Sequence, residues 1–161
     1  MLQDVRVLVA GVGNVLRGDD GFGVVAAQRL LAEPLPPEVQ VLDVGIGGIH
    51  LVQELLDPVD ALVIIDATEL GRRPGAVAIL RPDVRDPSGP DDLADMHYAT
   101  PERALMLARA LNVLPERVWI VGCQPDDAER LGDDLSPAAA AAVDPAIAEV
   151  RRLVARVLES A

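Results

Sequence analysis

Five short apolar runs, rich in Val, Leu and Ile, alternate along this chain with segments in which apolar residues recur at helical spacing. Some runs, such as "LVIIDA" at residues 62–67, have no polar residue until their end, which is typical of strands covered on both faces. The expected strands are residues 5–11, 39–45, 61–67, 75–81 and 117–123, and the expected helices are residues 21–33, 47–57, 100–111 and 136–160. This alternation predicts an α/β fold with an open sheet of about five strands and helices on both faces.

Local signals refine this prediction. Residues 68–74 are too few for a crossover helix, so we expect the third and fourth strands to form a hairpin and the sheet to be mixed. Ser136 and Thr100 are expected to cap the helices that follow them, and Pro145 is expected to kink the last helix or split it in two. Neither a repeat nor a linker interrupts the chain, so residues 1–161 are expected to form a single domain.

The acidic composition excludes several classes of partner. A formal net charge of -12 leaves no basic surface for nucleic acid and disfavours binding to an anionic membrane. No stretch approaches the roughly 18 apolar residues of a membrane span. The start of the chain, "MLQDVRVLVAGVGN", has the pattern of a strand and lacks the basic region of a signal peptide, and the single cysteine allows no internal disulfide. We expect a cytoplasmic monomer that binds neither nucleic acid nor membrane.

The glycine-rich segment "GVGNVLRGDDGFG", residues 11–23, joins the first expected strand to the first expected helix. Such turns often bind phosphate, but the dinucleotide motif needs glycine where this chain has Leu16, and the Gly-Lys-Ser/Thr ending of a P-loop is absent. Asp19 and Asp20 would also repel a phosphate. Taken alone, the aspartates are explained by the helix dipole and by capping of free N–H groups.

Other acidic residues stand at comparable places. Asp43 and Asp66 lie near the ends of the second and third expected strands, as Asp20 follows the first. In an open α/β sheet, ligands bind beyond the carboxyl ends of the strands. His97 ends a long irregular segment, residues 82–97, which can fold over the same crevice. Carboxylates together with an imidazole suit a divalent transition metal, so a cation is the expected guest.

The chain resembles the hydrogenase maturation proteases, which process the large subunit of nickel-iron hydrogenases. The resemblance is carried, in order, by "VLVAGVGNVLRGDDGFG", "VLDVGIGGIHLV", "LVIIDA", "PGAVAIL", "MHYATPERAL", "VWIVGCQP" and "GDDLSPAAAAAVDPAIAEV", which span nearly the whole chain. One departure is Ile46, which stands where the family usually has threonine. The resemblance implies a phosphorylase/hydrolase-like fold.

The resemblance also implies a site and an activity. By motif, Asp20, Asp66 and His97 are the metal ligands and the catalytic centre, and the metal is nickel already inserted in the substrate rather than a tightly bound cofactor of this protein. The partner is the precursor of a nickel-iron hydrogenase large subunit, from which a C-terminal extension is cleaved after a basic residue. Asp19 or Asp43 is a candidate base for activating water.

Three alternatives remain at this point. Cys123 with His97 would make a cysteine protease, although a cysteine at the end of a strand is more often a small buried apolar residue. The same ligands would also serve a non-catalytic nickel or hydrogenase chaperone, or an independent metallopeptidase with its own ion. A serine hydrolase is disfavoured because no G-x-S-x-G motif exists.

Overall fold

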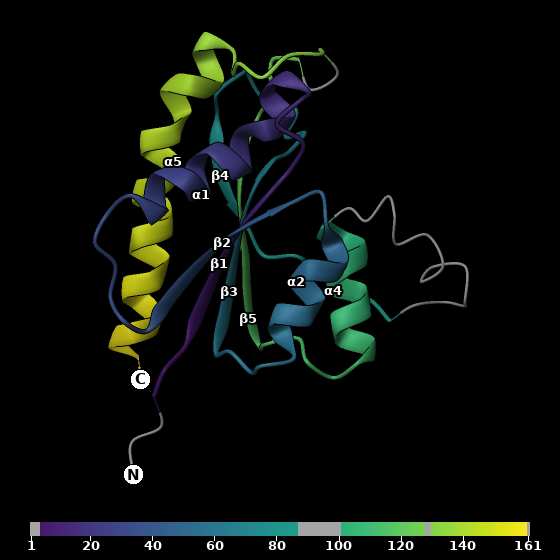
Figure 1. The fold of residues 1–161 in the computed structure, drawn as a ribbon, viewed down its shortest axis with the longest axis vertical. Helices are drawn as coiled ribbons and strands as arrows, with labels where there is room; N and C mark the ends of the chain where they lie inside the picture. The colour runs from purple at the N-terminus through teal and green to yellow at the C-terminus, as the bar shows by residue number, and fades with distance from the viewer. Residues whose placement is uncertain (1–3, 87–100, 128–129, 161) are drawn as a thin grey trace.

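The computed structural model describes residues 4–86, 101–127 and 130–160, and it confirms the predicted α/β fold (Figure 1). The strands are β1 (Val7–Val12), β2 (Val39–Gly45), β3 (Ala61–Ala67), β4 (Val77–Leu80) and β5 (Arg117–Cys123), and the helices are α1 (Phe22–Leu31), α2 (Gly48–Leu55), α4 (Pro101–Ala110) and α5 (Pro137–Glu159), with a 3-10 helix η1 (Gly18–Gly21) before α1. The strands form one sheet in the order β2-β1-β3-β5-β4.

Two helical layers cover the sheet. Helices α1 and α5 pack together on one face, and α2 and α4 lie side by side on the other (Figure 1). An apolar core lies on each face of the sheet, and alternate residues of β1 and β3 contribute to one or the other. Val9 and Val63 face α1 and α5, whereas Leu8 and Leu62 face α2 and α4. This burial on both faces explains why the central strands are apolar along almost their whole length.

The expected hairpin between the third and fourth strands is wrong, although the sheet is mixed as predicted. Strand β4 pairs antiparallel with β5, which lies between β3 and β4. Residues 68–76 instead cross the end of β5, where the N–H of Thr68 donates to the carbonyl of Cys123 at 2.9 Å and that of Gly75 to the carbonyl of Gln124 at 2.8 Å. The deeply buried β5 thereby gains a neighbour on each side, while the half-buried β4 takes the edge.

Of the two effects expected of Pro145, a kink or a split, the split is wrong, because α5 is one continuous helix through Pro145. Pro145 lies on the exposed side of the helix, and so does Ala141, whose carbonyl loses its helical partner. That carbonyl can bond to water, while the opposite side of the same turns is buried against the sheet. The Ser136 cap is confirmed, because its hydroxyl accepts from the N–H of Ala139 at 3.2 Å. Thr100 lies outside the described residues.

Helix α1 approaches the sheet unusually closely at two glycines. A Cβ atom added at Gly23 would lie 2.0 Å from the carbonyl oxygen of Ile65 and 2.5 Å from that of Val12. One added at Gly11 would lie 2.3 Å from the carbonyl oxygen of Gly23. The start of α1 therefore rests directly on the ends of β1 and β3, which fixes the loop between β1 and α1 in relation to β3.

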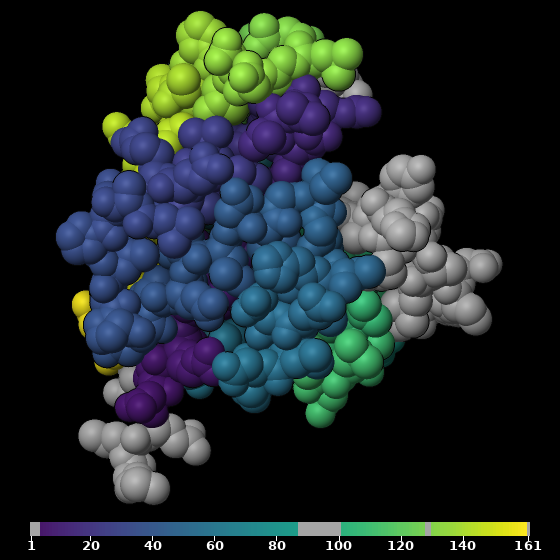
Figure 2. Space-filling view, in the orientation of Figure 1, coloured from purple at the N-terminus to yellow at the C-terminus, as the bar shows by residue number. Residues whose placement is uncertain are grey.

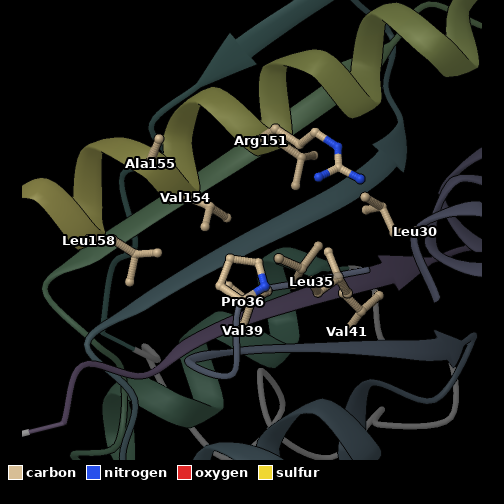
Figure 3. A pocket seen from close by; sticks show the side chains of 11 residues that line it. Leu30, Leu35, Pro36, Val39, Val41, Arg151, Val154, Ala155 and Leu158 are labelled. Atoms are coloured by element: carbon tan, nitrogen blue, oxygen red, sulfur yellow. The ribbon is translucent and has the colours of Figure 1, made fainter. Parts of the chain in front are cut away.

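An apolar pocket of about 130 Å³ opens between the end of α1, the start of β2 and the C-terminal half of α5 (Figure 3). Leu30, Val39 and Val154 line it, and Arg151 is the one charged residue among its described lining. The Arg151 guanidinium pairs with Glu33. The pocket lies toward the amino ends of β1 and β2, away from the predicted site, and we treat it as a gap in packing. Among the described residues, no helix combines the length and apolarity that a membrane crossing requires.

Candidate functional site

Asp20 and Asp66 come together where the carboxyl ends of β1 and β3 meet. These strands are parallel neighbours in the sheet, and η1, which carries Asp20, packs against β3, which carries Asp66 near its end. The Oδ2 atom of Asp20 accepts a hydrogen bond from the N–H of Asn14 at 3.0 Å. That bond folds the loop after β1 back on itself and fixes the direction of the Asp20 carboxylate.

Asp66 has a strongly altered acidity. Burial raises its pKa to about 8, and the negative charges of Asp20 and Glu102 add to the effect. The influence of those charges means that the three carboxyl groups lie within electrostatic reach of one another. Asp66 therefore stands next to excess negative charge, an arrangement that a bound cation would stabilise.

Glu102 is a member of this acidic group that the sequence analysis missed. It lies in the first turn of α4. Helix α4 leads into the parallel strand β5, so its last turn lies near the amino edge of the sheet and its first turn near the carboxyl edge. An acidic residue in a first turn is also explained by the helix dipole, so the sequence alone gave it no distinction. The sequence did place Glu102 in the first turn of an expected helix, directly after the expected cap Thr100 and Pro101, and this position could have identified it.

The raised pKa of Asp66 predicts a specific pH dependence of stability. The folded protein holds the Asp66 proton up to about pH 8, whereas the unfolded chain loses it near the ordinary value of 3.8, so the free energy of unfolding falls as the pH rises between these values. Asp66→Asn removes this loss because the amide cannot ionise. The free energy of unfolding of the variant, relative to that of the wild type, should therefore be at least about 1 kcal/mol higher at pH 8 than at pH 5. Urea unfolding of both proteins at the two pH values measures this, and an equal difference at both would contradict it.

Asp19, the other aspartate of the pair, points into the protein and is only 1% exposed. Its Oδ1 accepts from the N–H of Ser136 at 2.7 Å, and its Oδ2 accepts from the Ser136 hydroxyl at 2.7 Å and from the N–H of Asp126 at 2.8 Å. Burial by itself would raise the pKa of Asp19, but these bonds outweigh it and hold the pKa below its ordinary value. Asp19 thus ties the Asp20 loop to the segment between β5 and α5.

Gln124, directly after β5, connects a further loop to this edge. Its side chain is buried, and its Nε2 donates to both carboxylate oxygens of Glu69 at 3.0 Å. Its Oε1 accepts from the N–H groups of Leu70 at 2.6 Å and Arg72 at 3.4 Å. The Gln124 side chain therefore adds to the backbone hydrogen bonds that hold the loop after Asp66 to the end of β5, a role that no pattern in the sequence had singled out.

The remaining predicted residues do not join Asp20 and Asp66 in the described structure. Asp43 is exposed, and its carboxylate accepts from Nε2 of Gln28 at 3.2 Å. His50, the other histidine of the chain and not a predicted site residue, is exposed on α2, with its Nε2 3.4 Å from Oε1 of Glu54. His97 lies outside the described residues. Within residues 4–86, 101–127 and 130–160, no three His, Cys, Asp or Glu side chains are placed to share one metal ion.

Cys123 is buried in the apolar layer under α1 and α5. Its Sγ lies 3.7 Å from the carbonyl oxygen of Gln124. Burial raises the pKa of the thiol to about 11, with a further contribution from the charge of Asp19. A reactive cysteine needs a lowered pKa and access to solvent, and Cys123 has neither. The geometry therefore favours a structural role for it.

Comparison with known proteins identifies the family of this chain. The hydrogenase maturation protease family matches residues 24–153. The hydrogenase expression/formation protein HupD of Rhodobacter capsulatus is 36% identical over 148 residues, which are 91% of this chain and 70% of HupD. Among solved structures, a hydrogenase 2 maturation peptidase from a Thaumarchaeota archaeon is 32% identical, with a TM-score of 0.70 and coverage of 93% of this chain and 98% of that one. The hydrogenase maturating endopeptidase HybD of E. coli is 28% identical, with a TM-score of 0.75 and coverage of 97% and 94%. The chain belongs to the hydrogenase maturation protease family and is a peptidase.

Proposed function

We propose that this protein removes the C-terminal extension from the large-subunit precursor of a nickel-iron hydrogenase, and that it recognises nickel already inserted in that substrate. The observation that supports this most is that Asp20 and Glu102 lie within electrostatic reach of Asp66 at the carboxyl edge of the sheet. Such a group attracts a cation, and His97 would add an imidazole from the segment before α4. In this proposal, the carboxylates of Asp20 and Asp66 and the imidazole of His97 contact the nickel of the substrate.

Carboxylate and imidazole ligands are suited to contact a nickel ion that stays bound to the substrate rather than to remove it. Thiolates hold nickel in the hydrogenase more strongly than carboxylate or imidazole ligands, so Asp20 and Asp66 can contact an open nickel position without extracting the ion. Contact with a cation would lower the pKa of Asp66 and release its proton. The nickel would then orient the peptide of the substrate and polarise its carbonyl for attack by water.

The test is mass spectrometry of purified precursor, with and without nickel, after incubation with this protein. The nickel-loaded precursor should lose its C-terminal peptide, and the nickel-free precursor should remain intact. Intact loaded precursor would contradict the proposed activity and favour a chaperone. Equal cleavage of both forms would contradict recognition through nickel.

Metal analysis of the purified peptidase distinguishes the proposal from an independent metallopeptidase. We expect less than stoichiometric metal after dialysis, and processing that survives this step. A tightly held ion whose removal abolishes cleavage of the nickel-loaded precursor would favour a resident catalytic metal.

Replacement of Cys123 by alanine is expected to leave processing within about twofold of the wild type, because the thiol is buried and protonated at neutral pH. The loss of a buried sulfur should lower the free energy of unfolding by about 1 kcal/mol. Mass spectrometry of the nickel-loaded precursor measures the first effect and urea unfolding the second. Loss of cleavage in a folded variant would favour the alternative in which this protein is a cysteine protease with Cys123 as nucleophile.

A further inference from the structure

The large apolar side chains that the described residues expose fall into two groups. Leu31, Leu56 and Leu111 stand at the ends of α1, α2 and α4, which in this fold lie near the amino ends of the parallel strands. The others stand in the loops after β1, β2 and β5 or in the first turn of α2, at the carboxyl edge that carries Asp20 and Asp66; they are Val15, Leu16, Ile46, Ile49 and Leu131. Single exposed leucines are ordinary, but apolar groups gathered beside a catalytic edge indicate a contact surface.

Two of these residues are held side by side by the backbone. Leu16 is 65% exposed and Leu131 is 81% exposed. The N–H of Gly132 donates to the carbonyl of Leu16 at 2.9 Å, and the N–H of Gly18 donates to the carbonyl of Gly132 at 2.8 Å. The resulting parallel bridge pairs Arg17 with Gly132, and its register sets Leu16 beside Leu131. We call Val15, Leu16 and Leu131 the apolar ledge.

The ledge is fixed before any partner arrives. Beneath it, the three hydrogen bonds of Asp19 join the segments on which Leu16 and Leu131 stand. Figure 2 shows the segment after β1 (purple) lying against the segment between β5 and α5 (green), next to the start of α2 (blue). A surface that needs no reordering loses little conformational entropy when it is covered, which favours its use in binding.

The charges around the ledge are predominantly negative. Asp126, Asp127, Asp133 and Asp134 are exposed on the segment that carries Leu131. Arg130 is the one basic residue described on that segment, and its guanidinium donates to the backbone carbonyl of Asp134 at 3.0 Å. The partner that complements this surface has aliphatic residues flanked by lysine or arginine.

We propose that the apolar ledge docks the precursor protein through an aliphatic segment flanked by basic residues, next to the cleavage centre. This inference rests on the proposed function and names the surface that receives its substrate. Leu16 lies four residues before Asp20 in the same loop, so a polypeptide positioned at Asp20 is brought to the ledge. Contact there buries two leucines and sets acidic side chains against basic ones.

The experiment compares two double variants in the Asp20→Asn background, in which the precursor is not consumed. Leu16→Ser with Leu131→Ser removes the ledge. Leu31→Ser with Leu111→Ser is the matched control, since those side chains are 53% and 51% exposed at the opposite edge. Calorimetry with nickel-loaded precursor measures affinity, and thermal unfolding verifies that both variants fold.

The ledge variant should bind the precursor at least about tenfold more weakly than the Asp20→Asn protein, and the control should bind within about twofold. Asp133→Asn with Asp134→Asn should also reduce the dependence of binding on salt. Equal affinities of the ledge variant and the control would overturn the docking proposal. Ledge-dependent binding without cleavage by the wild-type protein would uphold docking and overturn the proposed function.

Discussion

Asp20→Asn should slow processing of the nickel-loaded precursor by about 1,000-fold while leaving the protein folded. The asparagine keeps an oxygen that can accept the N–H of Asn14, so the loop should retain its shape. The variant lacks the negative charge of Asp20, which acts on Asp66 and which, in the proposed function, contacts the nickel. Mass spectrometry of the released peptide over time measures the rate, and thermal unfolding measures stability.

Asp57→Asn is the matched control for this variant. Asp57 is an exposed carboxylate that pairs with Arg6 at 2.7 Å, beyond the end of α2 at the opposite edge of the sheet. An exposed ion pair contributes at most about 1 kcal/mol, and the control should process the precursor at the wild-type rate. A folded Asp20→Asn protein that retains more than a tenth of the wild-type rate would exclude Asp20 as an essential ligand.

Gly23→Ala should lower the free energy of unfolding by about 3 kcal/mol. The new methyl group would have to fit where the carbonyl oxygens of Ile65 and Val12 lie 2.0 Å and 2.5 Å away. Both contacts are backbone atoms of the sheet, so no side chain can rotate aside and α1 must shift. Because α1 follows η1 directly, processing should fall as well. Urea unfolding gives the stability and the cleavage assay gives the activity.

Gly47→Ala is the corresponding control, since Gly47 caps the start of α2 as Gly23 lies at the start of α1, at the same edge of the sheet. Its φ is negative, and an added Cβ would meet its nearest atoms, the carbonyl oxygen of Val44 and the Cβ of His50, at 3.5 Å and 3.6 Å. The change should therefore alter the unfolding free energy by less than about 0.5 kcal/mol. If the two variants were equally stable, the close approach of α1 to the sheet would be refuted.

The sequence predicted the elements well because burial on both faces leaves a simple apolar pattern. The bounds of β2, β3 and β5 coincide with the predicted ranges. Strand partners were harder, since the local pattern of β4 says nothing about whether β3 or β5 lies beside it. The pairing of β4 depends on β5, which follows some 40 residues later in the chain and pairs with a strand on each side.

The site was predictable in part for a similar reason. Strand-end position brought out Asp20 and Asp66, which the fold does bring together. It could not separate Asp19 from Asp20, because which of two adjacent carboxylates turns inward depends on donors from Ser136 and Asp126, more than 100 residues away. Glu102 was missed because its position relative to Asp66 depends on how α4 docks on the sheet.

The strand order has a consequence for how such peptidases can diversify. Asp20 lies on η1 after β1, and Asp66 lies near the end of β3. Both strands have other strands on either side, and α1 packs closely on their ends. The loops that follow β2 and β5 are peripheral to that pair and carry Ile46 and Leu131. On the proposed function, exchange of those outer loops between homologous enzymes should therefore change which precursor is recognised while Asp20 and Asp66 stay in place, so that substrate choice and cleavage can evolve separately.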